Sequence, residues 1–185
     1  MTAGVLGAAA EHLAGLLEAV QRCVYFLDAS RARLSWPLTG ERLAENPKDV
    51  ALFEALAAVN ERFAKLQDTL GAAMRHAAML AGEPTDTFLR TLVFFEKVGV
   101  LDAVAQWQLC RTTRNLAAHE YDIDYDRIAA HFNALDELLP GLYGTAARFV
   151  GYCESSLGIR PQPGAFAPEF AALTGRAGDS SVAQR

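Results

Sequence analysis

The sequence has few cysteines, and none of them are paired at a metal-binding or redox spacing. Cys23, Cys110 and Cys153 lie far apart and have apolar neighbours. A zinc site or a redox motif needs ligands at short fixed spacings, such as CxxC, and a disulfide framework needs an even set of cysteines. We therefore expect three buried, reduced thiols.

Long apolar runs are missing as well. No stretch approaches the roughly 20 uninterrupted apolar residues that a membrane-spanning helix requires. Residues 1–6 lack the basic region that precedes the apolar part of a signal peptide. These two absences predict a cytoplasmic protein that has no membrane partner.

Positive charge is in the minority. The chain has 17 Lys and Arg against 22 Asp and Glu, which gives a net charge of −5. Such a protein does not attract nucleic acid over its whole surface. An RNA ligand would therefore need a local cationic patch, and the candidates are Arg90, Lys97, Arg111 and Arg114.

Patterns that bind metals or phosphate cofactors are also missing. His12, His76 and His131 fall on separate predicted helices, and no two of them share a ligand spacing such as i, i+4. No glycine-rich phosphate loop is present. We expect no metal site and no cofactor.

Helical periodicity is what the sequence has in abundance. Apolar residues recur at alternating steps of three and four along residues 6–27, 52–74 and 128–153. No segment shows the sustained apolar–polar alternation of a strand. The sequence predicts an all-α fold, an up-and-down bundle of about five helices over residues 1–157.

Helix caps and breakers give the expected boundaries. The expected starts after the first helix are residues 46–49, Thr85 or Asp86, Asp102, and Asp122 or Asp124. The expected ends are near residue 80, at Gly99 and near Leu157. Pro140 should kink the last helix, because proline removes a backbone donor and crowds the preceding turn.

Two segments fall outside this helical pattern. Residues 30–47 form a loop whose Trp36-Pro37-Leu38 can pack on the bundle. Residues 158–185 are rich in Pro, Gly, Ser and Ala and have only a weak apolar cluster, Phe166, Phe170 and Leu173. We expect this tail to be poorly ordered, or to order against a partner.

The fourth predicted helix gathers polar side chains on one face. On a helical wheel of about 100° per residue, this face holds Arg111, Arg114, Asn115, His119 and Tyr121, beside Trp107. The opposite arc is small and apolar, which suits it to packing. The same residue types also occur on ordinary solvated helix faces, and the helix dipole alone favours a histidine near a C-terminus.

These groups also suit metal-free cleavage of RNA. An arginine can hold a phosphate with two parallel hydrogen bonds, and a histidine can move the proton of the ribose 2′-hydroxyl. Asn115 could orient the imidazole of His119 or donate to the phosphate. Arg114 and His119 lie about 140° apart on the wheel, so one straight helix does not easily bring both to one phosphorus. Two copies that face each other across a two-fold axis could do so.

Residues 114–121, Arg-Asn-Leu-Ala-Ala-His-Glu-Tyr, resemble the R-x-x-x-x-H-x-Y signature of HEPN toxins of the HepT type. A polar residue directly after the arginine, here Asn115, is typical of that signature. The resemblance covers residues from roughly 48 to 157.

This resemblance implies a metal-independent endoribonuclease that acts as a homodimer, with the two motifs lining a cleft at the interface. Arg114 and His119 would be catalytic and Asn115 supportive, and Arg111 is our candidate for binding the RNA substrate. A companion nucleotidyltransferase antitoxin of the MNT type would neutralise the toxin, in studied types by adding AMP to the motif tyrosine, here Tyr121. Two alternatives remain: a catalytically silent HEPN subunit that binds a nucleotidyltransferase, and a purely structural helical dimer.

Overall fold

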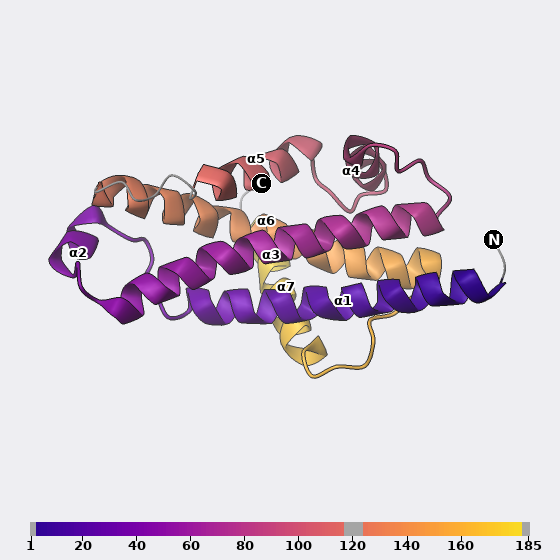
Figure 1. Cartoon of the computed structure of the whole chain (residues 1–185), viewed down its shortest axis with the longest axis horizontal. Coiled ribbons are helices and arrows are strands. Elements are labelled where there is room, and N and C mark those ends of the chain that lie inside the picture. The colour runs from indigo at the N-terminus through magenta and orange to yellow at the C-terminus, as the bar shows by residue number, and fades with distance from the viewer. Residues whose placement is uncertain (1–2, 117–123, 183–185) are drawn as a thin grey trace.

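The computed structural model describes residues 3–116 and 124–182, and within these ranges the chain is helical with no strand (Figure 1). The described residues form seven helices: α1 (Ala3–Arg31), α2 (Gly40–Glu45), α3 (Val50–Leu80), α4 (Phe88–Lys97), α5 (Val104–Leu116), α6 (Tyr125–Leu157) and α7 (Ala167–Val182). The all-α prediction is confirmed. The structure has two helices more than the five expected, namely α2 and α7.

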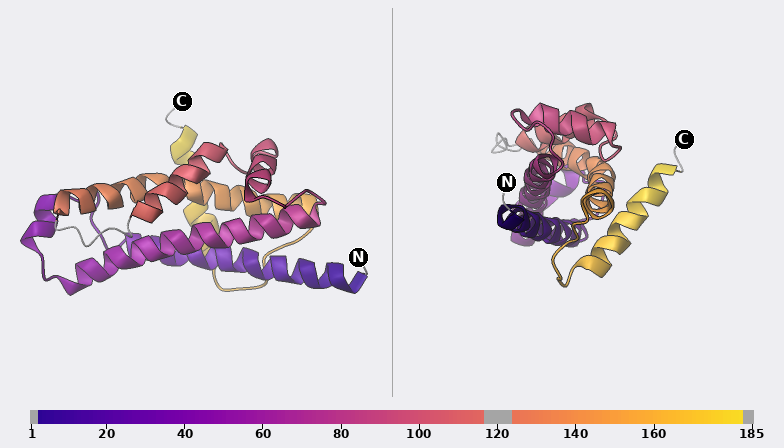
Figure 2. Two further views of the ribbon diagram at one scale, coloured as in Figure 1. Left: turned by 45° about the horizontal axis from the view of Figure 1, so that its top comes forward. Right: turned by 90° about the vertical axis from the view of Figure 1, so that its right-hand side faces the viewer.

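The long helices α1, α3 and α6 lie side by side and form the body of the molecule (Figures 1 and 2). Each contributes the apolar stripe that its periodicity predicted, and the largest fully buried side chains include Phe63, Phe149 and Leu17. Burying a side chain of this size contributes roughly 1.5–3 kcal/mol. No helix in the described part of the chain is both long enough and apolar enough to cross a membrane.

The helix starts show which capping predictions were right. Asp124 caps α6, accepting hydrogen bonds from the backbone N–H of Asp126 and Arg127. The cap of α3 is Asp49, inside the expected segment 46–49, and its carboxylate accepts from the N–H of Leu52 at 3.0 Å. The cap of α4 is Thr87, so the prediction of Thr85 or Asp86 was wrong.

Asp102 does not cap α5. Its carboxylate instead accepts a hydrogen bond from Arg148 of α6 at 2.8 Å, and the N–H of Val104 donates to Glu96. The tertiary partner Arg148 therefore takes the carboxylate that the sequence assigned to a cap. Pro140 lies within α6, which continues on both sides of it.

The segment between α1 and α3 packs on the bundle as expected. Leu38 is buried, and its backbone exchanges two hydrogen bonds with the side chain of Asn133 on α6. The short helix α2 follows it, with Thr39 as its cap. This segment ties the α1–α3 connection to α6.

The C-terminal segment, which the sequence predicted to be poorly ordered or to order against a partner, contains a helix. Residues 167–182 form α7, which packs on α6 and α1. Phe170 is buried, and Phe166 lies 5.3 Å from Tyr25 of α1 between ring centroids. The apolar cluster that looked weak in the sequence therefore finds its partners on the bundle.

The three cysteines are free, and Cys110 and Cys153 are buried as expected. Cys23 is only partly buried. Burial raises the pKa of the Cys110 thiol to about 11 and that of Cys153 to about 12. Both thiols are therefore neutral and unreactive at neutral pH.

Candidate functional site

Helix α5 presents a buried side and an exposed side, which its helical wheel predicted in part. Trp107, Cys110 and Thr113 are buried against the bundle. Arg111 and Asn115 are exposed, and Arg114 lies between these extremes. The wheel placed Trp107 on the polar face beside Arg114, but the structure buries this ring, and Leu109, on the arc expected to pack, is 53% exposed.

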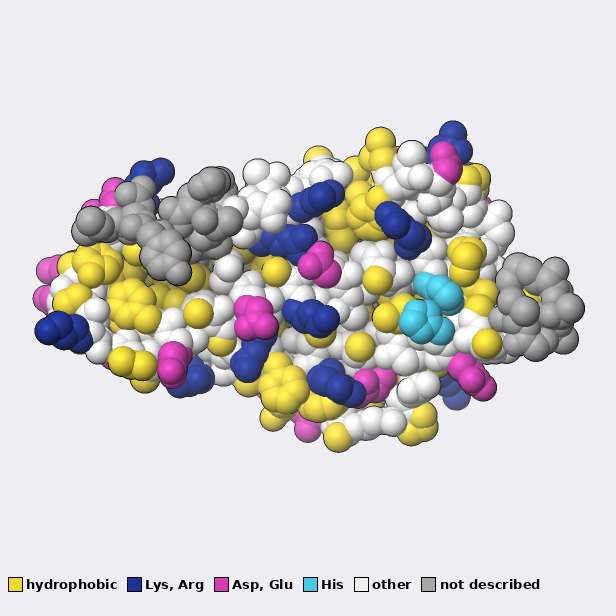
Figure 3. All heavy atoms as spheres, viewed as in Figure 1, with side chains coloured by type: hydrophobic (Ala, Val, Ile, Leu, Met, Phe, Trp, Pro, Cys, Tyr) yellow, Lys and Arg dark blue, Asp and Glu magenta, His cyan; other side chains and the backbone are white. Residues whose placement is uncertain are grey.

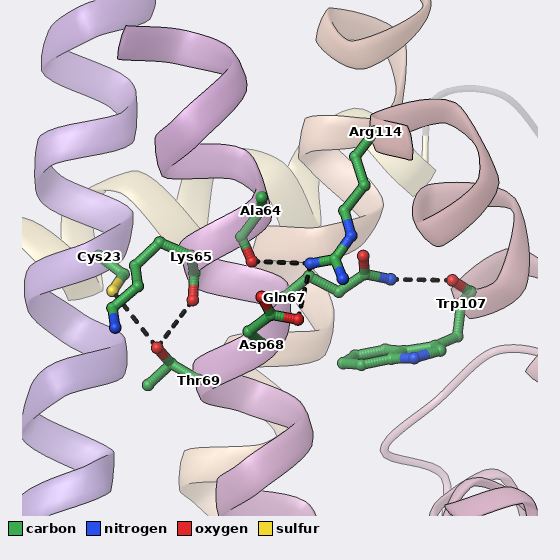
Figure 4. Close-up of polar contacts among 8 residues, drawn as sticks. All are labelled: Cys23, Ala64, Lys65, Gln67, Asp68, Thr69, Trp107 and Arg114. Carbon is green, nitrogen blue, oxygen red and sulfur yellow. Dashed lines mark hydrogen bonds and ion pairs between the residues drawn. The ribbon is translucent and has the colours of Figure 1, made fainter. Parts of the chain in front are cut away.

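Trp107 anchors α5 to α3 and α4. The side-chain amide of Gln67 on α3 donates a buried hydrogen bond to the carbonyl oxygen of Trp107 at 2.9 Å (Figure 4). The ring of Trp107 packs against Phe88 of α4, with 6.0 Å between the centroids. These contacts fix the position from which Arg111 and Arg114 extend.

Arg114 reaches across to α3 (Figure 4). Its Nη1 donates to the carbonyl oxygen of Ala64 at 2.9 Å and to the carboxylate of Asp68 at 2.7 Å. The side chain is only 14% exposed, whereas that of Asp68 is 65% exposed. Its Nε is buried and has no hydrogen-bond partner among the described residues. The guanidinium is therefore held in place, with part of its donor capacity unused.

Arg111 and Arg114 open onto a groove of about 580 Å³ that runs over α3 between α1 and α5. Its described lining includes Arg75 and Asp68 from α3 as well as these two arginines. The described lining thus holds three arginines and one carboxylate. On a protein of net charge −5, this is a local cationic site. Figure 3 shows several basic side chains along the middle of this face, with acidic side chains between them.

Two histidines lie at the same groove. His12 of α1 and His76 of α3 pack edge to face, with 4.8 Å between ring centroids. The Nε2 of His76 lies 2.9 Å from the carbonyl oxygen of Ala9, so this nitrogen carries the proton and donates. No group of three or more potential metal ligands occurs in the described part of the chain, so the pair alone does not make a metal site.

The structure brings together some of the predicted site residues and not others. Arg111 and Arg114 share the groove, whereas Asn115 is exposed near the end of α5 and is not part of the groove's described lining. His119 and Tyr121 lie outside the described residues.

The cationic patch is also composed differently from the prediction. Arg90 and Lys97 line a separate hollow along α4, and Arg90 pairs with Asp86 at 3.0 Å. Arg75, which the sequence analysis missed, takes their place in the groove. No local signal marked Arg75 or the His12–His76 pair, because both depend on how α1, α4 and α5 pack around α3.

No protein-family model, no curated protein and no solved structure matches this chain.

Proposed function

We propose that this chain is a metal-independent endoribonuclease of the HEPN type, the toxin of a pair whose antitoxin is an MNT-type nucleotidyltransferase. The observation that carries the proposal concerns Arg114, the first residue of the motif 114–121, and Arg111, one turn before it. Both side chains line a cationic groove on an acidic protein. A local patch of this kind is what an RNA ligand requires here.

The reaction would be an intramolecular transesterification. His119 removes the proton of a ribose 2′-hydroxyl, and the 2′-oxygen attacks the adjacent phosphorus. The 2′-O–P bond forms and the P–O5′ bond breaks, which leaves a 2′,3′-cyclic phosphate and, once the leaving oxygen is protonated, a 5′-hydroxyl. Arg114 stabilises the added negative charge on the phosphorane, and Asn115 orients the imidazole or donates to the phosphate.

Arg114 and Arg111 have separate tasks in this proposal. Arg114 is pre-positioned by Ala64 and Asp68, so little side-chain freedom is lost when a phosphate binds. Arg111 is exposed and supplies a positive charge one turn earlier on α5. Arg111 thus draws the RNA into the groove and Arg114 acts at the reacting phosphate.

The site would be shared between two copies of the chain. Because Arg114 is tied to α3 and lies about 140° from His119 on the wheel, the imidazole of a second copy meets the phosphate more easily. Mixing two inactive variants, Arg114→Ala and His119→Ala, tests this. Random reassociation gives mixed dimers with one intact site, and about a quarter of the wild-type activity returns. A mixture as inactive as its components contradicts the shared site.

Tyr121 would be the position at which the antitoxin acts. An AMP group there places a phosphate beside the arginines of α5 and obstructs the groove. Co-expression with the nucleotidyltransferase is expected to add the mass of one AMP to the peptide that contains Tyr121. Tyr121→Phe should abolish that mass shift and leave the toxin active.

Cleavage of RNA by the purified chain in excess EDTA tests the proposal directly. We expect fragments with cyclic phosphate and 5′-hydroxyl ends from the wild-type chain and none from His119→Ala. Intact RNA with the wild-type chain, together with harmless expression in the absence of the antitoxin, overturns the ribonuclease function.

A second candidate is a catalytically silent subunit that binds the nucleotidyltransferase. The observation that favours it is the ion pair between Arg114 and Asp68, which engages the motif arginine within its own chain. In this case the His119→Ala variant still binds the nucleotidyltransferase, and neither the wild-type chain nor the variant cleaves RNA. Loss of cleavage in His119→Ala from an active wild type excludes this candidate.

A further inference from the structure

The groove extends well beyond the motif residues on α5. Its lining on α3 runs from Gln67 to Met79, which at 1.5 Å per residue corresponds to about 18 Å. Asp68 and its partner Arg114 lie at one end of this stretch, and Arg75 and His76 lie towards the other. The cationic groups are thus spread along the groove, which suits a chain of phosphates better than a single phosphate.

Aromatic rings line the groove near Arg75. The guanidinium of Arg75 lies 5.3 Å from the ring centroid of Phe88, and Phe88 in turn packs against Trp107. Gly71 makes room for both rings, because a Cβ there would meet Phe88 Cζ at 3.2 Å and Trp107 Cζ2 at 3.5 Å. Because the guanidinium of Arg75 lies over this ring, a phosphate that draws Arg75 away exposes the ring face to a base next to the phosphate contact.

We propose that the Arg75 end of the groove is a second RNA subsite, in which Arg75 holds a phosphate that flanks the cleaved one and Phe88 receives a base. This inference rests on the proposed function, because it takes RNA as the ligand. The strand that fits is single-stranded, since the bases of a duplex are stacked inside and do not reach an aromatic side chain. Contacts of this type tolerate many sequences, so the subsite sets strand length and affinity more than base identity.

Binding of an uncleavable RNA to full-length variants tests the subsite. The probe is a fluorescent 2′-O-methyl RNA of about ten nucleotides, which lacks the attacking 2′-hydroxyl. We expect Arg75→Gln to bind it several-fold more weakly and to lower the slope of log K against log salt by about 0.7, the value for one lost phosphate contact on a single strand. Within the described part of the chain, Arg75 makes no hydrogen bond, and its side chain contacts the ring of Phe88. We therefore expect Arg75→Gln to fold, which circular dichroism checks.

Arg90→Gln is the matched control. It changes the net charge of the chain by the same amount as Arg75→Gln, but the arginine it removes lines the separate hollow along α4. We expect its affinity and salt slope to equal those of the wild-type chain. If Arg75→Gln and Arg90→Gln behave alike, or if the wild-type chain does not bind the RNA at all, the subsite is overturned.

Cleavage assays separate this inference from the proposed function. If the wild-type chain cleaves RNA, we expect Arg75→Gln to raise KM rather than to lower kcat, because the lost contact lies away from the reacting phosphate. A chain that binds RNA through Arg75 but does not cleave it overturns the ribonuclease and supports the subsite. A chain that cleaves RNA with an unchanged KM in Arg75→Gln overturns the subsite alone.

Discussion

The Nη1 of Arg114 on α5 donates to the Asp68 carboxylate on α3 at 2.7 Å, and the same atom donates to the carbonyl oxygen of Ala64. This ion pair lies at one end of the groove's lining on α3 and partly neutralises the arginine that begins the motif. Asp68 is exposed, so a phosphate that approaches the groove meets its negative charge before it reaches Arg114.

Asp68→Asn is therefore expected to bind RNA more tightly. Removing the carboxylate frees the charge of Arg114 for phosphate, and an interaction of about 1 kcal/mol at an exposed pair corresponds to about fivefold in affinity. The free energy of unfolding should fall by no more than about 1 kcal/mol, because one partner of the pair is exposed. Fluorescence anisotropy with the uncleavable RNA and urea denaturation measure the two effects.

Asp86→Asn controls for net charge. It removes a carboxylate that also pairs with an arginine, Arg90, but does so away from the groove. We expect little change in RNA affinity. Equal gains in both variants would show that only the total charge matters. Weaker binding by Asp68→Asn would show that the positioning of Arg114 by Asp68 contributes more to RNA affinity than the negative charge of Asp68 costs.

Gly40 at the start of α2 is expected to be essential for the packing of α2 on α6. A Cβ there would overlap the carboxylate of Asp126 and lie 2.8 Å from its backbone nitrogen, so the two helices would have to separate. Gly40→Ala should lower the free energy of unfolding by about 1–3 kcal/mol. Urea denaturation followed by circular dichroism gives this value.

Gly151 provides the comparison, because it lies inside α6 and a Cβ there meets nothing within 4 Å. Gly151→Ala should raise the free energy of unfolding by about 0.5–1 kcal/mol, since alanine favours the helix. A Gly40→Ala protein as stable as Gly151→Ala would contradict the close α2–α6 contact.

The cysteines report on whether α5 stays docked. Burial raises the pKa of Cys110 on α5 to about 11, so at pH 8 roughly a thousandth of this thiol is ionised. We expect iodoacetamide to modify the partly buried Cys23 well before Cys110 and Cys153, as mass spectrometry of the peptides would show. All three should react at similar rates in urea. Fast modification of Cys110 in the folded chain would mean that α5 leaves the bundle.

The same shifts give a pH dependence of stability. Because the folded chain holds Cys110 and Cys153 as neutral thiols, with pKa values above that of an unfolded cysteine, their contribution is fully present at neutral pH. It declines as the pH rises through about 8.5, the pKa of an unfolded cysteine, and towards the folded values of about 11 and 12. Unfolding followed between neutral and alkaline pH should show this decline, and serine at both positions should reduce it.

The sequence predicted best what depends on neighbours along the chain. The wheel of α5 separated the buried Cys110 from the exposed Arg111, and Asp124, one of the two caps expected for the last helix, is the cap of α6. These features follow from helical geometry and from capping chemistry within three residues. They need no knowledge of tertiary structure.

What the sequence could not predict depends on packing between distant segments. Asp68 and Arg114 are 46 residues apart, and nothing in either helix alone identifies the other as its partner. The same holds for His12 and His76, which only the contact of α1 with α3 brings together. Helix α7 was missed because its apolar residues become a packing surface only when the bundle supplies Tyr25 and its neighbours.

Photo-crosslinking tests most directly the central claim, that RNA binds in the groove between α3 and α5. A single-stranded RNA that carries 4-thiouridine is irradiated with the full-length chain, and the modified peptides are identified by mass spectrometry. We expect crosslinks in residues 67–79, at Phe88 and in residues 104–116, and we expect Arg111→Gln to weaken them. Crosslinks confined to other parts of the chain, such as α6 or α7, would contradict the account.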